Sequence, residues 1–317
     1  MQRAAARRCR AHTLRVALAG LGLFLGVANA NSQAGQRPPQ RLEGTGLYSD
    51  FATLEVDAHH IAFSPQYPLW TDGAAKRRWI SIPAGAVIDG SDAEAWVFPV
   101  GTRLWKEFSF NGRRVETRFM ERGPDGWTYA AYAWSEDGQD AALVSERGRR
   151  NAYPLGAGRS HTIPGVNDCK ACHQGGRAEV LGFSALQLSP DRDPGALHAD
   201  AGLLDIEDLI EKGVLVGVPK ERRRPRIEAT SAAERAALGY LHGNCGHCHN
   251  DHGSLKNIGL SLRHESGAAV PRAVASTVDQ PVRKPAPGPS PEARRRVEPR
   301  HPERSGLVER IGSRYFK

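Results

Sequence analysis

Two segments of the sequence share one arrangement of cysteine and histidine, and this repeat constrains the chain more than any other feature. The segments VNDCKACHQGG and LHGNCGHCHND both contain the pattern C-x-x-C-H. The residues concerned are Cys169, Cys172 and His173 in the first segment, and Cys245, Cys248 and His249 in the second. Residues three and four apart share one face of a helical turn. Each segment is therefore predicted to present two thiols and one imidazole to a single bound group.

The pattern C-x-x-C-H is typical of covalent attachment of c-type haem. The two thiols of each segment can bond one porphyrin, and the histidine can bind its iron from below. The sequence thus predicts two covalently bound haem c groups, with His173 and His249 as proximal iron ligands. A redox-active disulfide or half of a zinc site are alternatives for each pair, and structural disulfides are common in exported proteins.

A second axial ligand is expected for each iron, because electron-transfer haems usually carry a distal Met or His. Besides Met1, the chain has one methionine, which falls in a predicted strand and is interpreted first as a core residue. His247 lies inside the second motif and is predicted to point away from its iron. The distal candidates are His161, His198, His252, His264 and Met120.

The N-terminal segment predicts export. The first 15 residues contain five arginines and no acid, and an apolar run over residues 16–30 ends in Ala28-Asn29-Ala30. This pattern predicts a secretory signal peptide, residues 1–30, that is cleaved after Ala30. The mature protein is then expected to be periplasmic or secreted and to have no transmembrane segment. Its charge is close to neutral over residues 31–264, which argues against a nucleic-acid partner.

An α+β fold is predicted. A polar leader over residues 31–45 precedes a mainly-β domain over 46–153, a sandwich or small barrel that contains all six tryptophans. Two extended runs around Gly123-Pro124-Asp125-Gly126 predict a hairpin. The segment WTDGAAKRRW (70–79) is interpreted as a solvated strand end, with the lining of a binding site as the alternative.

A mainly-α, loop-rich, cytochrome c-like di-haem region is predicted over residues 154–264. Helices are expected in LDIEDLIEKGVL and from Ser231, which with Glu234 has the spacing of a capping box, to about Leu241. A Pro/Arg-rich linker over 265–304 and a terminal helix stub over 305–317 follow. Apolar walls for the two haems are expected from Leu181, Phe183 and Leu186, and from Ile258, Leu260 and Leu262.

The order of several phrases resembles a family of exported bacterial di-haem c-type cytochromes, which is related to segments found with sorbosone-type sugar dehydrogenases. The phrases include SPQYPLWTDGAAKRRWI, WVFPVGTRLWKEF, RRVETRFMER and the two cysteine segments. The resemblance covers about residues 45–316 and implies haem attachment at both C-x-x-C-H motifs. In the family, text similar to RVEPRHPERSGLVERIGSRY precedes a Met-Pro-Pro segment whose methionine is a plausible distal ligand. This sequence ends at Lys317, so a truncated C-terminal region is expected.

The expected function is that of a periplasmic di-haem cytochrome. It would carry single electrons between a dehydrogenase and an acceptor, so its partner is expected to be a redox protein. A peroxidase-like haem enzyme with one open iron site is an alternative. A secreted binding module with zinc or disulfides at the cysteine pairs is another.

Overall fold

A computed structural model describes residues 37–196, 204–253, 255–266, 270–283 and 295–312. The described residues belong to one compact unit, and their mixture of strands and short helices confirms an α+β fold. The predicted signal peptide over residues 1–30 and the distal candidate His198 lie outside the described residues.

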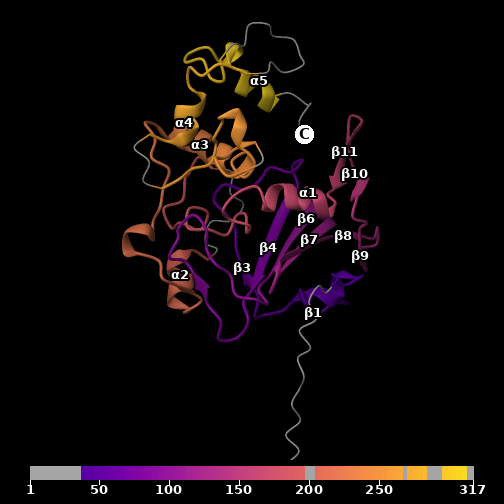
Figure 1. The fold of residues 1–317 in the computed structure, drawn as a ribbon. Helices are drawn as coiled ribbons and strands as arrows, with labels where there is room; N and C mark the ends of the chain where they lie inside the picture. Colours follow the sequence, from indigo (N-terminus) through magenta and orange to yellow (C-terminus); the bar gives the residue numbers. More distant parts are fainter. Residues whose placement is uncertain (1–36, 197–203, 254, 267–269, 284–294, 313–317) are drawn as a thin grey trace, which may run out of the picture. The chain divides into compact units, whose positions relative to one another are not determined.

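The largest element is an antiparallel sheet with the strand order β3-β4-β6-β7-β8-β9 (Figure 1). Its strands are β3 (Ile61–Ala62), β4 (Ala75–Ser81), β6 (Arg103–Phe110), β7 (Arg113–Gly123), β8 (Gly126–Trp134) and β9 (Ala141–Leu143). The predicted hairpin is confirmed, because β7 and β8 pair up to Gly123 and Gly126 and leave Pro124 and Asp125 as the turn. Gly126 adopts a φ of 142°, a value that glycine tolerates because it lacks a Cβ atom.

Three short strand pairs accompany this sheet. Two are antiparallel: β1 (Tyr48–Asp50) with β2 (Glu55–Val56), and β10 (Arg149–Gly156) with β11 (Arg159–Ile163). The third pairs β5 (Ile88–Asp89) in parallel with β12 (Leu215–Val216). The last pair joins the predicted β domain to the predicted haem region.

The expected sandwich or small barrel is not formed. The main sheet is open, and irregular segments and short helices cover its faces instead of a second sheet. Adjacent residues of a strand point to opposite faces, so Trp79 and Ile80 of β4 belong to different cores. The core around Trp79 includes Leu42, Leu47, Tyr48, Trp105 and Phe119. The core around Ile80 includes Leu104, Met120, Phe183, Leu188 and Leu209.

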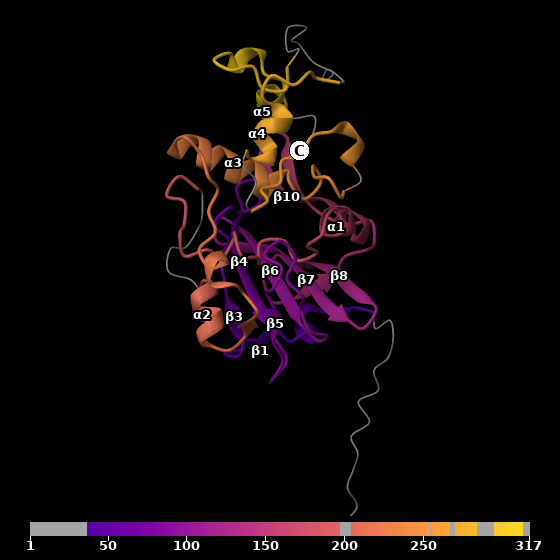
Figure 2. The ribbon, with the colours of Figure 1, turned by 60° about the vertical axis from the view of Figure 1, so that its left-hand side comes forward.

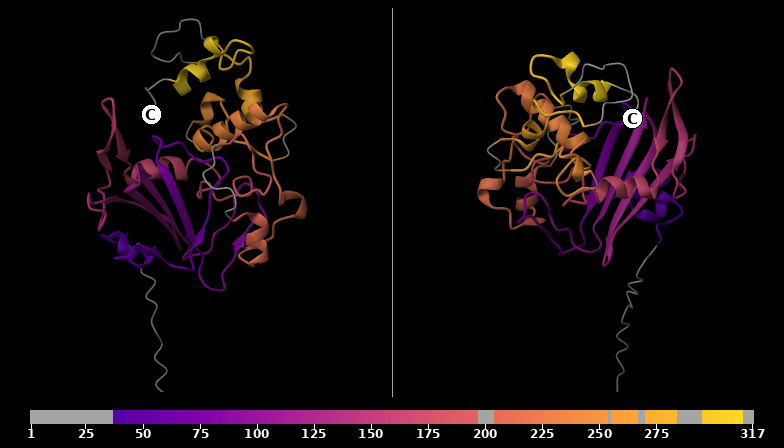
Figure 3. Two further views of the ribbon diagram at one scale, coloured as in Figure 1. Left: turned by 180° about the vertical axis from the view of Figure 1, so that it is seen from behind. Right: turned by 45° about the horizontal axis from the view of Figure 1, so that its top comes forward.

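The described helices are short, and most of them lie at one end of the sheet (Figures 1 and 3). They are α1 (Val166–His173), α2 (Ile206–Glu211), α3 (Ala232–Asn244), α4 (Arg272–Thr277) and α5 (Gly306–Gly312). The 3-10 turns are η1 (Leu42–Thr45), η2 (Lys220–Arg222), η3 (Lys256–Ile258) and η4 (Pro302–Arg304). Figure 2 shows α2 beside β3 and away from α3, which is consistent with its side chains packing into the Ile80 core.

The helix predicted from Ser231 is confirmed and runs three residues further than expected, to Asn244. The Ser231 hydroxyl accepts a hydrogen bond from the Glu234 backbone N–H at 3.2 Å, as a helix N-cap does. The Glu234 carboxylate turns back to the Thr230 N–H at 2.7 Å. The cap therefore begins the helix at the expected residue, and Cys245 follows directly at its C-terminal end.

The segments predicted from the sequence do not form separate domains with a hydrophobic core each. The boundary between residues 153 and 154 falls inside β10, and the Ile80 core combines residues from both sides of it. Leu42, which the sequence placed in a polar leader, is fully buried. The predicted linker contains α4, and the Arg296 guanidinium donates to the Ser276 carbonyl at 2.7 Å. These segments are ordered by apolar burial and by arginine–carbonyl contacts.

In the described part of the chain, no helix combines the length and the apolar character that crossing a bilayer requires.

Candidate functional site

The first cysteine motif lies on α1, a helix of two turns that packs against β8. The Asp168 carboxylate accepts a hydrogen bond from the Gly165 N–H at 2.9 Å and so closes the N-terminal end of the helix. Cys169, Cys172 and His173 all border one cavity. The structure therefore brings the three residues of the first predicted motif together on one cavity wall.

His173 has the hydrogen bonding of a metal-binding histidine. Its Nδ1 lies 2.7 Å from the carbonyl oxygen of Glu179, which can only accept, so Nδ1 carries the proton. Burial lowers the pKa of His173 to about 4, which keeps the ring neutral at neutral pH. A histidine that binds a metal through one ring nitrogen is usually oriented by a hydrogen bond from the other ring nitrogen. The bond from Nδ1 to Glu179 is of this kind. Nε2 is therefore the ring nitrogen of His173 that is available to a metal.

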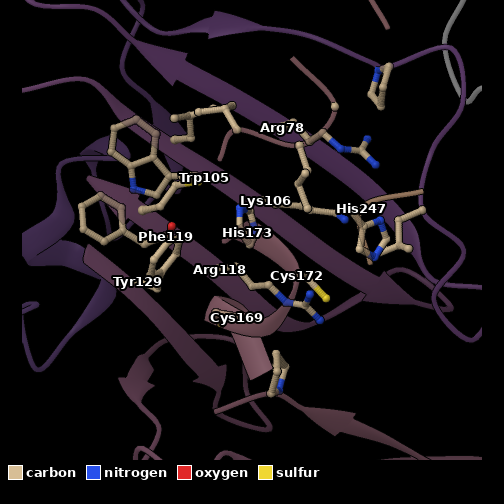
Figure 4. Close-up of a pocket in the computed structure, with 18 of the residues that line it drawn as sticks. Arg78, Trp105, Lys106, Arg118, Phe119, Tyr129, Cys169, Cys172, His173 and His247 are labelled. Atoms are coloured by element: carbon tan, nitrogen blue, oxygen red, sulfur yellow. The ribbon is translucent and has the colours of Figure 1, made fainter. Parts of the chain in front are cut away.

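The cavity beside His173 encloses about 230 Å³ between α1, the sheet and the loop after α1 (Figure 4). Of the three residues expected to form an apolar wall, Leu181 borders the cavity, together with Val180. Phe183 and Leu186 do not border it and are packed in hydrophobic cores. The Tyr129 hydroxyl is buried there without a hydrogen-bond partner among the described residues. Further lining residues are Phe63, Leu104 and Met120. Most lining side chains are apolar, and a smaller number are polar or charged, as is usual for a cofactor site.

The second cysteine motif follows α3. Cys245 occupies the C-terminal cap of the helix, and the backbone N–H groups of Cys248 and His249 return to its carbonyl at 3.1 and 2.8 Å. The Nδ1 atom of His249 is buried and has no hydrogen-bond partner among the described residues. Burial is the main reason why the pKa of His249 lies below its ordinary value. The motif has the helical turn that attachment needs, but its histidine is less firmly oriented than His173.

The two motifs are in direct contact. Asn250 directly follows the second motif and is buried. Its side-chain amide donates a hydrogen bond at 2.8 Å to the carbonyl of Gly175, which lies two residues after the first motif. A Cβ atom on Gly175 would lie 2.4 Å from the His247 carbonyl oxygen, so glycine permits the close approach. These contacts hold the two cysteine segments side by side, although they are far apart in the sequence.

Cys172, His247 and Cys248 form a cluster at this contact, in which one potential ligand atom from each lies within 4.8 Å of the others. Hydrogen bonds from Cys248 and then from His247 lower the pKa of the Cys172 thiol. His247 also borders the first cavity. The sequence predicted that His247 points away from the iron of its own motif, and the structure turns it toward the other motif.

The structure separates the distal candidates that it describes. Met120 on β7 borders the first cavity. His161 does not, because its two ring nitrogens are engaged by Glu116 at 2.7 Å and by Asp72 at 3.2 Å. His161 is thus a buried residue with a described partner at each ring nitrogen, and it lies outside the cavity that holds His173.

The distal candidates His252 and His264, which follow the second motif, also lie away from the first cavity. His252 is exposed, and its backbone N–H donates to the side-chain Oδ1 of Asn250 at 2.9 Å. The His264 backbone N–H donates to Nδ1 of His242 at 3.1 Å. Neither histidine borders the cavity that holds His173.

Comparison with protein-family models, curated proteins and solved structures gave no match for this chain. The family resemblance therefore stays a prediction, and the function rests on the geometry of the motifs.

Proposed function

We propose that this chain is an exported di-haem c-type cytochrome that carries single electrons between a dehydrogenase and an acceptor protein. In this proposal residues 154–264 form its cytochrome c-like region, and both C-x-x-C-H motifs hold haem. The observation that carries the proposal is His173, a half-buried imidazole whose Nδ1 is held by the Glu179 carbonyl and which shares a cavity with Cys169 and Cys172.

The residues of the first motif have separate tasks in this proposal. Cys169 and Cys172 would tether the porphyrin by thioether bonds, and His173 would bind the iron through Nε2. Iron in haem c supplies one-electron oxidation and reduction. Met120 and His247 border the same cavity and carry the sulfur or nitrogen atom that a distal ligand needs. The solvent access that this mainly apolar lining allows would, together with axial ligation, set the reduction potential.

The second motif would hold its haem through Cys245, Cys248 and His249. The unsatisfied Nδ1 of His249 fits the group less well than His173 does. The two motifs touch, so electrons entering at one iron would have a short path to the other. A pair of linked irons suits transfer between two protein partners.

A zinc-binding module is the second candidate, and the cluster of Cys172, His247 and Cys248 favours it. Thiolate and imidazole are the ligands that zinc prefers, although a structural zinc site normally has four of them. All four described cysteines are free thiols, so they are available to either group.

The test uses the chain exported from a host that has the c-type cytochrome maturation machinery. A carrier is expected to show low-spin haem, to be reduced by ascorbate and reoxidised by ferricyanide reversibly, and to lack peroxide turnover. High-spin haem with peroxide turnover would instead identify an enzyme. Stoichiometric zinc without iron, measured by elemental analysis, would identify the binding module.

A further inference from the structure

The second cysteine of each motif lies at the contact between the two motifs. Cys172 and Cys248 belong, with His247, to the cluster in which one ligand atom of each residue lies within 4.8 Å of the others. The Cys248 sulfur also lies 3.9 Å from the carbonyl oxygen of Ala171, the residue directly before Cys172. The two sulfur atoms are therefore neighbours in space, although their cysteines are far apart in the sequence.

The first cysteine of each motif is placed differently. Cys169 packs against the Ile80 core. Cys245 packs against a separate core, which includes Tyr67 and Leu238. The fold thus brings one thiol of each motif together, and it engages the other thiol of each motif in a different hydrophobic core.

The backbones at the contact are closely packed and hold the two motifs together. A Cβ atom on Gly175 would lie 2.4 Å from the His247 carbonyl oxygen, and one on Gly253 would lie 2.6 Å from the Gly175 carbonyl oxygen. The side-chain amide of Asn250 donates to the same Gly175 carbonyl at 2.8 Å. The second cysteines of the two motifs are therefore kept close by contacts that involve neither thiol.

The pair is also accessible to chemistry. Cys172 and Cys248 are half-buried and are free thiols in the structure. The sulfur atoms of a disulfide are about 2 Å apart, so a pair within 4.8 Å needs a shift of less than about 3 Å, which rotation of the side chains can supply. Disulfides form and persist in the oxidising compartments that exported proteins enter.

We propose that Cys172 and Cys248 form a disulfide that joins the two motifs in the chain before haem is attached. The step is thiol–disulfide exchange with a disulfide oxidant. The S–H bonds of both cysteines and the S–S bond of the oxidant break, and a new S–S bond joins the cysteines. The oxidant leaves as two thiols that carry both protons and both electrons.

The disulfide itself needs no haem and therefore goes beyond the proposed function. Its consequence rests on that function, because each thioether bond to haem uses one free thiol. The disulfide leaves each motif with a single thiol, Cys169 or Cys245. Both haems can then be fully attached only after the disulfide has been reduced.

The test uses the full chain, exported from a host that lacks the c-type cytochrome maturation machinery. The haem-free chain is treated with EDTA to remove metal ions and equilibrated with reduced and oxidised glutathione. Remaining thiols are then alkylated, and the chain is digested with trypsin without reduction. Cleavage after Lys170 separates the two cysteines of the first motif. Residues 160–170 then contain Cys169, residues 171–177 contain Cys172, and residues 236–256 contain Cys245 and Cys248.

In the folded chain we expect residues 171–177 to be linked to residues 236–256, with fragment masses that place the bond at Cys248. Cys248→Ser should lose this linkage, whereas the matched control Cys245→Ser should retain it. In urea, linkage within each motif should replace it, because closing a short loop costs less entropy than closing a long one. This comparison shows that the fold selects the pairing.

Linkage within the motifs of the folded chain would overturn the inference, and so would four alkylated cysteines in excess oxidised glutathione. The wild-type fragment masses assign the bond, so the result does not depend on the folding of a variant. A chain that acquires no haem in a host with the maturation machinery would overturn the proposed function instead and leave the disulfide standing. A haem-loaded chain should lack the linked peptides, because thioether bonds have used both thiols.

Discussion

The Cys248 sulfur lies 3.9 Å from the carbonyl oxygen of Ala171, a residue 77 positions earlier that sits inside the first motif. The contact shows that the two cysteine segments share one site region and are not independent modules. Groups attached to both motifs would be held close to each other. Electron transfer between them would then be intramolecular and independent of the protein concentration.

This proximity predicts electronic coupling between the two haems. The exported protein is expected to show an exciton-split circular dichroism band in the Soret region. The double variant Cys245→Ala/Cys248→Ala should retain one haem and lose the splitting, because the second chromophore is gone. A wild-type spectrum equal to that of the single-haem variant would contradict the close placement.

Replacing His173 is expected to affect one haem. His173→Ala removes the imidazole that Glu179 orients, so low-spin haem should fall from two groups per chain to about one. His59→Ala is the matched control, because His59 is exposed, was not a candidate ligand and does not border the first cavity. Low-spin content is measured by electron paramagnetic resonance of the oxidised protein. Equal low-spin content in the two variants would exclude His173 as a ligand.

Asn250 is expected to be important for stability. Its amide donates to the carbonyls of Gly175, Gly246 and His247 at 2.8, 3.0 and 3.1 Å, and the residue is buried. Asn250→Ala leaves these carbonyls without a partner, which should lower the free energy of unfolding by about 2–3 kcal/mol. Asn257 is exposed and serves as the control. Asn257→Ala should change the free energy of unfolding by less than about 0.5 kcal/mol. Urea unfolding measures both, and equal effects would contradict the role of Asn250.

The buried pair of Glu116 and His161 predicts a particular pH dependence of stability. Burial acts to raise the pKa of Glu116, but Arg118 and His161 bring it below its usual value. Burial acts to lower the pKa of His161, but Glu116 and then Asp72 raise it. The Glu116 contribution is present above about pH 4.3 and the His161 contribution below about pH 6.5, where the unfolded groups titrate. The pair therefore stabilises the fold most between these two values.

As the pH rises above about 6.5 through the raised pKa of His161, the wild-type free energy of unfolding should fall. Glu116→Gln should lose about 3 kcal/mol near pH 6, as expected when one partner of a buried pair is removed, and should show a flatter pH profile. The control Glu55→Gln changes an exposed carboxylate on β2. Parallel pH profiles for wild type and Glu116→Gln would show that the pair does not contribute in this way.

Local features of the fold could be predicted from the sequence. The four residues from Gly123 to Gly126 were enough to predict the turn between two strands. Ser231 was recognised as the N-cap of the helix that follows it directly. The motif residues Cys169, Cys172 and His173 were found because their spacing follows the helical repeat. In each case the deciding interactions join residues close in sequence.

Long-range placement could not be predicted in the same way. The faces of the sheet are covered by segments that contain Leu42 and Phe183, and not by the expected second sheet. Both residues are buried by contacts with segments distant in the sequence. Arg78, Lys106 and Arg118 lie next to one another because of the register of three strands, so the sequence around Lys106 alone did not predict their grouping. For His247 the sequence predicted only that the side chain points away from its own motif, because it lies two residues after Cys245. It did not predict the contact with the first motif.

The most direct test of the account is the intact mass of the exported chain together with its pyridine haemochrome spectrum. We predict a mass increase equal to two haems and a spectrum that gives two haem c per chain. A chain of unmodified mass without haem absorbance, produced beside a control cytochrome that is matured in the same cells, would contradict it.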